Sequence, residues 1–186
     1  MGGMTCSRAA AAIGIALAVA SAASCQAQGF TVNGRVVAVL DGDAIEVLDA
    51  GKQLTRIRLA SIDAPEKAQP FGQAAKQHLA SLAYGRDVSA RCRKREVRPE
   101  SGRVRAVCTV YAADGSDLNL AQLLAGTAWF YAQYRREQSP AEAWRYERAE
   151  RAARAARLGL WRETAPEEPW AWRHRQPATA TIHGAR

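Results

Sequence analysis

One stretch of the sequence, IRLASIDAPE (residues 57–66), places three charged side chains around a rigid turn. Arg58 lies among apolar residues, Asp63 follows five positions later, and Glu66 comes directly after an Ala-Pro pair. Charged groups at this spacing are a poor way to build a core, because a buried charge without a partner is costly. The stretch therefore indicates a site that holds one cation and two anions at the end of a strand.

An Asp-Gly-Asp run that ends with Asp43 supplies further carboxylates close to this site. Three strands joined by tight turns are predicted over residues 30–40, 44–50 and 53–62. In such an antiparallel meander the first and third strands end on the same side, so Asp43 and Asp63 can converge. Two aspartates, a backbone carbonyl and waters suit Ca²⁺, and the absence of a neighbouring His or Cys in the sequence disfavours zinc. Taken alone, Asp-Gly-Asp is more typical of a hairpin turn.

Two arginines complete a set of residues that suits phosphodiester hydrolysis. Arg58 belongs to the third predicted strand, and Arg103 begins the fifth after Ser-Gly. Arginine stays charged and binds phosphate oxygens through two donors. Attack on a phosphodiester passes through a more anionic state, which needs cations where the charge develops. A metal can hold the attacking water, and a carboxylate such as Glu66 can accept its proton. For Arg56, on the same strand face as Arg58, we favour an ordinary solvated position.

The rest of the chain predicts the scaffold that positions these residues. Helical periodicity covers residues 70–85, and two more strands follow over residues 87–96 and 103–112. Two further helices begin at Asp117 and Ser139, the second with Glu142 completing a capping box. Five short strands bury little as an open sheet, so we expect them to close into a small barrel with three helices packed on it. The predicted fold class is α+β, mainly β.

Composition and terminal segments predict an exported protein with a polyanionic partner. The chain of 186 residues has a net charge of +8, which favours nucleic acid or an anionic membrane. Residues 1–27 combine one early arginine, an apolar run and small residues, which is typical of a signal peptide, and the run is shorter than the roughly 20 apolar residues of a membrane span. Cys25 also suggests a lipoprotein site, although the large aliphatic residue usual three positions earlier is missing. Residues 28–162 form the expected domain, and residues 163–186 read as a tail.

Two cysteines in the body of the chain predict a disulfide. Cys92 and Cys108 fall in two successive predicted strands, where a cross-strand bridge is geometrically possible. In an exported protein such a pair is more often a disulfide than a metal site. Two separate buried thiols remain the alternative.

The sequence contains, in this order, the motifs DGDAIEV, IRLASIDAPE, SGR, DLN, a Gly-Thr-Ala-Trp element and ARLGLW. Together these motifs resemble the staphylococcal nuclease (thermonuclease) family, from about Val32 to Trp161. The resemblance implies a five-stranded OB-fold-like barrel with three helices, and Ca²⁺-dependent cleavage of DNA and RNA with little base specificity that leaves 3′-phosphates. By motif position it implies calcium ligation by Asp43, Asp63 and the Ala64 carbonyl, an outer carboxylate at Asp41, a general base at Glu66, phosphate binding by Arg58 and Arg103, and nucleotide contacts by Tyr131 and Tyr134.

The sequence departs from the family pattern around the second arginine. Ser101 stands where the family usually has an aromatic residue, and Arg105 competes with Arg103 two positions later. The Arg-x-x-Ala spacing to Ala106 favours Arg103. The two tyrosines have an uncertain register, and core packing is an alternative role for both of them.

Two other functions are compatible with the sequence. An OB-fold module that binds nucleic acid without cleaving it would share the fold and the charge. A basic envelope-associated protein facing anionic lipid would share the charge alone. The retained carboxylates and arginines favour the enzyme, which we expect to act as a monomer on DNA and RNA without membrane insertion.

Overall fold

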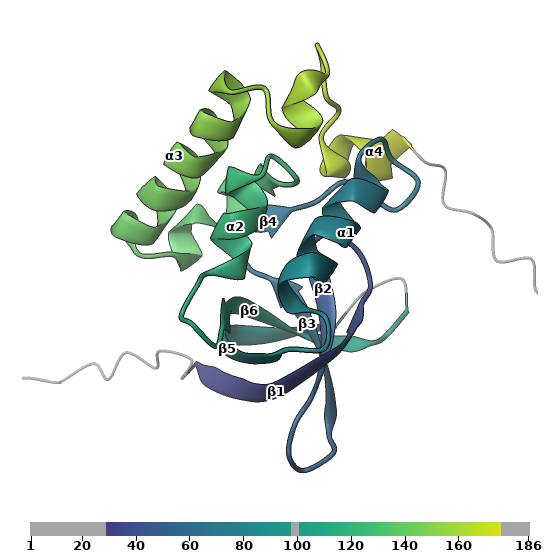
Figure 1. Cartoon of the computed structure of the whole chain (residues 1–186), viewed down its shortest axis with the longest axis vertical. Coiled ribbons are helices and arrows are strands. Elements are labelled where there is room, and N and C mark those ends of the chain that lie inside the picture. The colour runs from purple at the N-terminus through teal and green to yellow at the C-terminus, as the bar shows by residue number, and fades with distance from the viewer. Residues whose placement is uncertain (1–28, 98–100, 176–186) are drawn as a thin grey trace, which may run out of the picture.

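Five strands close into a barrel in the computed structural model, which describes residues 29–97 and 101–175 (Figure 1). The closed order is β1-β2-β3-β6-β5. All neighbouring pairs are antiparallel except β3 and β6, which run parallel. The strands are β1 (Phe30–Val39), β2 (Ala44–Leu48), β3 (Leu54–Leu59), β5 (Asp87–Val97) and β6 (Val104–Ala112). A separate two-stranded sheet pairs β4 (Ile62–Asp63) with β7 (Trp129–Phe130).

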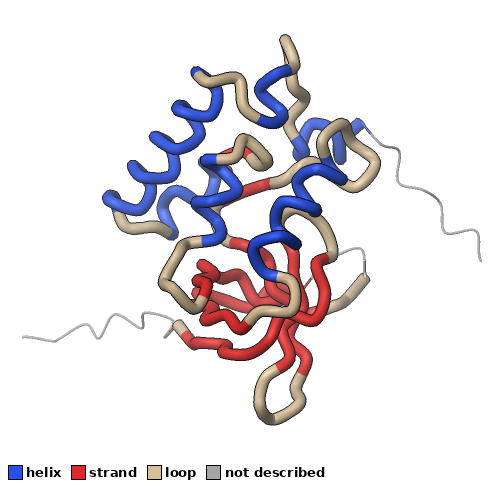
Figure 2. Tube along the Cα trace, viewed as in Figure 1, coloured by secondary structure: helices blue, strands red, loops and turns tan. Residues whose placement is uncertain are grey.

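The helices gather at one end of this barrel (Figure 2). They are α1 (Gly72–Ala83), α2 (Leu118–Leu124), α3 (Pro140–Ala155) and α4 (Pro169–Arg175), with 3-10 turns at Ala132–Glu137 and Gly159–Arg162. The predicted barrel with three packed helices is confirmed, and α4 is an additional helix within the segment that the sequence suggested as a tail. Within the described ranges, none of the helices is long and apolar enough to cross a membrane.

Strand alternation fills the barrel interior with branched side chains. Ile45, Val47, Ile57 and Leu59 are fully buried, while the residues between them face outward. β-branched residues fit such a pleated surface well. The outward positions of β3 can therefore hold charged residues. In this way one strand contributes both buried core residues and the charged residue Arg58.

Local capping residues set two of the helix starts as predicted. The Asp117 carboxylate accepts a hydrogen bond from the Leu120 amide at 3.0 Å, and the Ser139 hydroxyl accepts one from the Glu142 amide at 3.2 Å. The predicted capping box is incomplete, because the Glu142 side chain accepts from Arg93 at 2.6 Å instead of from the backbone. A hydrogen bond between two charged groups is stronger than one to a neutral amide.

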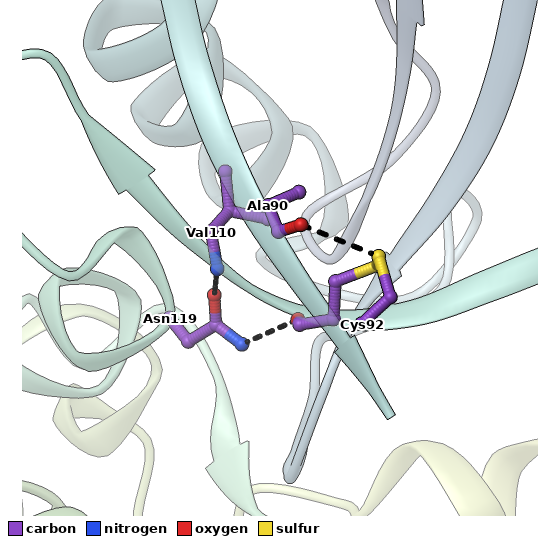
Figure 3. The surroundings of a disulfide bond; sticks show 5 residues. Ala90, Cys92, Val110 and Asn119 are labelled. Atoms are coloured by element: carbon purple, nitrogen blue, oxygen red, sulfur yellow. Dashed lines mark hydrogen bonds between the residues drawn. A yellow bond between two sulfur atoms is a disulfide. The ribbon is translucent and has the colours of Figure 1, made fainter. Parts of the chain in front are cut away.

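The predicted disulfide is present inside the barrel. Cys92 and Cys108 face each other across β5 and β6 and are joined, with both residues almost fully buried. Figure 3 shows Asn119 beside this bridge. The Asn119 side chain accepts from the Val110 amide and donates to the Cys108 and Ala60 carbonyls. The bridge and this buried amide together fix β6 against β5 and α2.

Replacing both cysteines with alanine is expected to lower the free energy of unfolding by about 3 kcal/mol, because a short cross-linked loop no longer restricts the unfolded chain. Thermal unfolding with and without reductant measures this. The wild type should unfold at a lower temperature in reductant, whereas the unfolding temperature of the variant should not change. A wild-type unfolding temperature that is the same with and without reductant would contradict the prediction.

Candidate active site

The predicted convergence of two aspartates is present in the structure. Asp43 lies in the turn between β1 and β2, and Asp63 ends β4. One nitrogen, Nη2 of Arg58, lies 3.3 Å from the Asp43 carboxylate and 2.8 Å from that of Asp63. The Asp63 side chain is only 1% exposed and that of Arg58 14%. A mostly buried cation is thus held between two mostly buried anions.

Backbone contacts position the Asp43 turn. The Ala64 amide donates to the Asp43 carboxylate at 3.2 Å, and the Leu59 amide donates to the Asp43 carbonyl at 2.8 Å. Gly42 passes so close to α1 that an added Cβ would lie 2.6 Å from the side chains of Ala64 and Ala75. Only glycine allows this approach, and the turn is therefore tied directly to the Asp63 turn.

A buried glutamine of α2 supports the same turn and was not identified from the sequence. The Gln122 side chain donates to the Gly42 carbonyl at 2.6 Å and to the Ala75 carbonyl at 3.1 Å. It is fully buried. Its only sequence signal is a polar residue on the buried face of a short helix, which does not reveal a partner 80 positions away.

The electrostatics of the site show how strongly these charges depend on one another. Burial raises the pKa of Asp43 to about 7, against the opposing effect of Arg58 and with a further increase from Asp41. Burial alone would lower the pKa of Arg58, but the Asp43 and Asp63 carboxylates raise it above its ordinary value. Arg58 is therefore a permanent cation, and added positive charge would favour the ionised form of Asp43.

These residues border a cavity of about 210 Å³ at one end of the barrel. Its lining comprises Leu40, Asp41, Asp43, Ala44, Arg56, Ile57, Arg58, Asp63, Ala64, Pro65, Glu66 and Arg105. Most of the predicted site is thus brought together around one space, including Ala64 and Glu66. Arg56 also borders the cavity and is paired with Glu46 at 2.8 Å.

The second predicted arginine, Arg103, does not lie at this cavity. It precedes β6 and is exposed, whereas Arg105 lines the cavity. The parallel register pairs Ile57 with Ala106, which sets Arg105 beside the outward face of β3. Arg105 also contacts Glu96 at 3.2 Å. Spacing within one strand does not define the register between β3 and β6, so the sequence alone did not show that Arg105 borders the cavity. A phosphate contact by Arg103 remains a prediction.

The two predicted tyrosines lie close together beside the site but do not line the cavity. Their rings are 5.1 Å apart, and the Tyr131 ring is 5.3 Å from that of Trp170. Burial raises the pKa of Tyr131, with a further contribution from the Asp63 charge. The Lys94 ammonium lies 4.5 Å from the Tyr134 ring centre. A nucleotide contact remains a prediction for both tyrosines.

An arginine from the C-terminal segment reaches the same carboxylates. Arg173 on α4 contacts Asp63 at 2.7 Å and Glu66 at 2.7 Å. Sequence reasoning missed this residue, because it lies 110 positions from Asp63 in a segment that read as a tail.

The donor set at the cavity fits a hard divalent cation. Asp43, Asp63 and Ala64 all line the cavity, so two carboxylates and one backbone carbonyl belong to its residues. Oxygen donors of this kind suit Ca²⁺. Among residues 29–97 and 101–175, no group of three or more His, Cys, Asp or Glu side chains is gathered as a ready-made metal site. Two carboxylates with a backbone carbonyl leave further positions to water or substrate.

A larger open depression of about 830 Å³ lies between β5, β6 and the start of α3. Its cations are partly neutralised by neighbouring acids: Arg93 contacts Glu142 at 2.6 Å and Lys94 contacts Glu137 at 2.6 Å. Size alone does not make it the reactive centre, and the smaller cavity holds the converging carboxylates.

Comparison with known proteins agrees with the geometry. The family described as "Staphylococcal nuclease homologue" matches residues 56–163. An uncharacterized endonuclease of Escherichia coli is 40% identical over 145 residues, covering 78% of this chain and 87% of that protein. A micrococcal nuclease of Shigella flexneri is 40% identical over 148 residues, covering 75% and 79%. Protein ParB of Escherichia coli is 37% identical over 174 residues, covering 89% of both. The chain belongs to the staphylococcal nuclease family, as its motifs predict.

Proposed function

We propose that the protein is an exported, Ca²⁺-dependent nuclease that hydrolyses DNA and RNA with little base specificity and leaves 3′-phosphate ends. The observation that supports this most directly is the convergence of Asp43 and Asp63 on Arg58, in a cavity that Glu66 also borders. Family membership and relatives described as endonucleases support the same class of activity.

Each residue has a defined part in this proposal. Asp43, Asp63 and the Ala64 carbonyl would hold Ca²⁺, which supplies positive charge for the phosphate and a bound water. Arg58 binds a non-bridging phosphate oxygen and stabilises the charge that develops on it. Glu66, partly exposed at the cavity, accepts the proton of the attacking water.

Arg105 takes the second phosphate contact in this proposal. It lines the cavity, whereas Arg103 does not. Its pairing with Glu96 orients the guanidinium and leaves other donors for substrate oxygens. Arg58 and Arg105 then approach one phosphate from two neighbouring strands.

Export is supported by the signal-like residues 1–27, which lie outside the described part of the chain. The disulfide between Cys92 and Cys108 supports it as well, because such bonds persist in oxidising compartments. We propose a periplasmic or secreted location, with lipid anchoring at Cys25 as the less favoured alternative.

Removal of the metal is expected to abolish activity. Hydrolysis of single-stranded DNA should proceed with Ca²⁺ and fall by at least about 100-fold in EGTA, because charge at the phosphate is no longer neutralised. Adding excess Ca²⁺ back is the control and should restore cleavage. Tight DNA binding without cleavage under either condition would instead favour the module that binds nucleic acid without cutting it.

A further inference from the structure

We propose that the C-terminal segment (residues 163–175) is an autoinhibitory element, in which Arg173 occupies the carboxylates of the active site and must leave before metal and substrate enter. The inference rests on the proposed function for the identity of the metal. It adds a regulatory contact made by Arg173, which lies outside the matched family region, residues 56–163.

The contact involves two of the four acidic residues that line the cavity. Arg173 donates to one Asp63 oxygen at 2.7 Å and to the other at 3.3 Å, and to Glu66 at 2.7 Å. Arg58 donates to one of the same Asp63 oxygens at 2.8 Å. Both Asp63 oxygens are therefore engaged by guanidinium groups, and Glu66 is paired with a cation. In this arrangement a metal or a proton must compete with an arginine for both Asp63 oxygens and for one oxygen of Glu66.

Other contacts dock the segment, so the arginine is not a lone surface contact. The Gln69 side chain donates to the Glu167 carbonyl at 2.6 Å, and Pro169 is buried. Trp170 packs against the small apolar cluster that includes Trp129, and its ring lies 5.3 Å from that of Tyr131. These contacts hold α4, yellow in Figure 1, where Arg173 reaches the site.

The docking is also weak enough to be reversible. The helix α4 has only seven residues, and isolated helices of this length are unstable. The Arg173 side chain is 40% exposed, and a cavity of about 170 Å³ remains beside the segment, lined by Phe71, Trp129 and Trp172 among others. This incomplete packing reduces the apolar contact that is lost on release.

Charge decides which cation the carboxylates prefer. Arg173 carries one positive charge and a divalent metal carries two, so the metal gains more from the same pair of acids. The metal must still bind to the fraction of molecules from which Arg173 has withdrawn, and this fraction reduces its apparent affinity. The segment therefore sets the calcium concentration at which the enzyme becomes active.

Calcium binding to Arg173→Ala, measured by titration calorimetry on the purified protein, tests the proposal. We expect the variant to bind Ca²⁺ about tenfold more tightly than the wild type, because the competing cation is gone. Arg175→Ala is the matched control, because it removes the same charge from the same helix but pairs with Glu167 instead of the site. Its affinity should equal that of the wild type.

The possible results separate the two claims. Equal affinity of the wild type and Arg173→Ala would overturn the autoinhibitory role while leaving the calcium site intact. Absence of calcium binding in every variant would refute the proposed metal dependence. The proposed autoinhibitory role would then be refuted as well.

Hydrogen exchange gives a second readout that does not depend on the variant. Saturating Ca²⁺ should increase amide exchange in residues 163–175 of the wild type several-fold, because the segment is released. Exchange in α3 is the internal reference and should not change. Equal or stronger protection of the segment in Ca²⁺ would overturn the proposal.

Discussion

Replacing Arg58 with alanine is expected to lower kcat/KM for single-stranded DNA by about 1,000-fold, because a preorganised charge at the reacting phosphate is typically worth 100- to 1,000-fold. Arg58 also orders the two carboxylates that are proposed to bind the metal. It is the cation that Asp43 and Asp63 share. Without it the two carboxylates repel each other, and one of them is expected to take up a proton.

The same variant should lose stability in a way that metal corrects. Loss of one partner from a buried charge cluster costs about 3–5 kcal/mol when nothing replaces it. Thermal unfolding of Arg58→Ala should therefore occur at lower temperature in EGTA, and Ca²⁺ should recover part of the difference. Activity should not recover with it, because the metal does not replace the contact to the phosphate.

Arg35→Ala is the control for the loss of one arginine charge. Arg35 is also on a barrel strand, but it pairs with Asp87 at the exposed surface. Surface pairs contribute about 0–1 kcal/mol, so stability should change little and activity should stay near that of the wild type. An Arg58→Ala enzyme within threefold of wild-type activity would place the phosphate contact elsewhere.

Features set by neighbouring residues and by hairpin pairing were predicted from the sequence, whereas the register of the parallel strands and the docking of distant segments were not. The meander, the Asp117 and Ser139 caps and the convergence of Asp43 with Asp63 follow from alternation, turns and antiparallel direction. These depend on interactions over a few residues or on one hairpin geometry. Local patterns of this kind are readable in one chain.

The remaining site features depend on long-range packing. Arg105 reaches the cavity because β6 lies parallel to β3 in one register, which nothing within either strand specifies. Arg173 reaches Asp63 because α4 docks back on the barrel end. The Glu142 side chain pairs with Arg93 across 49 positions in place of its expected local contact. For Arg173 and Glu142 the charged side chain pairs with a residue far away in the sequence, which no local pattern specifies.

The second large effect separates the two candidate arginines at the start of β6. Arg105→Ala is expected to lower kcat/KM for DNA by about 100-fold, because one charged donor to the phosphate is lost from the cavity. Arg103→Ala should change it by less than about threefold, since an exposed arginine outside the cavity contributes mainly general attraction for a polyanion. Each variant removes the same charge, and the positions are two residues apart.

Salt dependence distinguishes the two roles further. Loss of Arg105 should reduce turnover at every salt concentration, because its contact is made at the reacting phosphate. Loss of Arg103 should matter most at low salt, where long-range attraction is strongest. Thermal unfolding of both variants checks that the Glu96 pairing of Arg105 is not needed for folding. A larger loss from Arg103→Ala than from Arg105→Ala would mean that Arg103 makes the phosphate contact, as its spacing to Ala106 predicts.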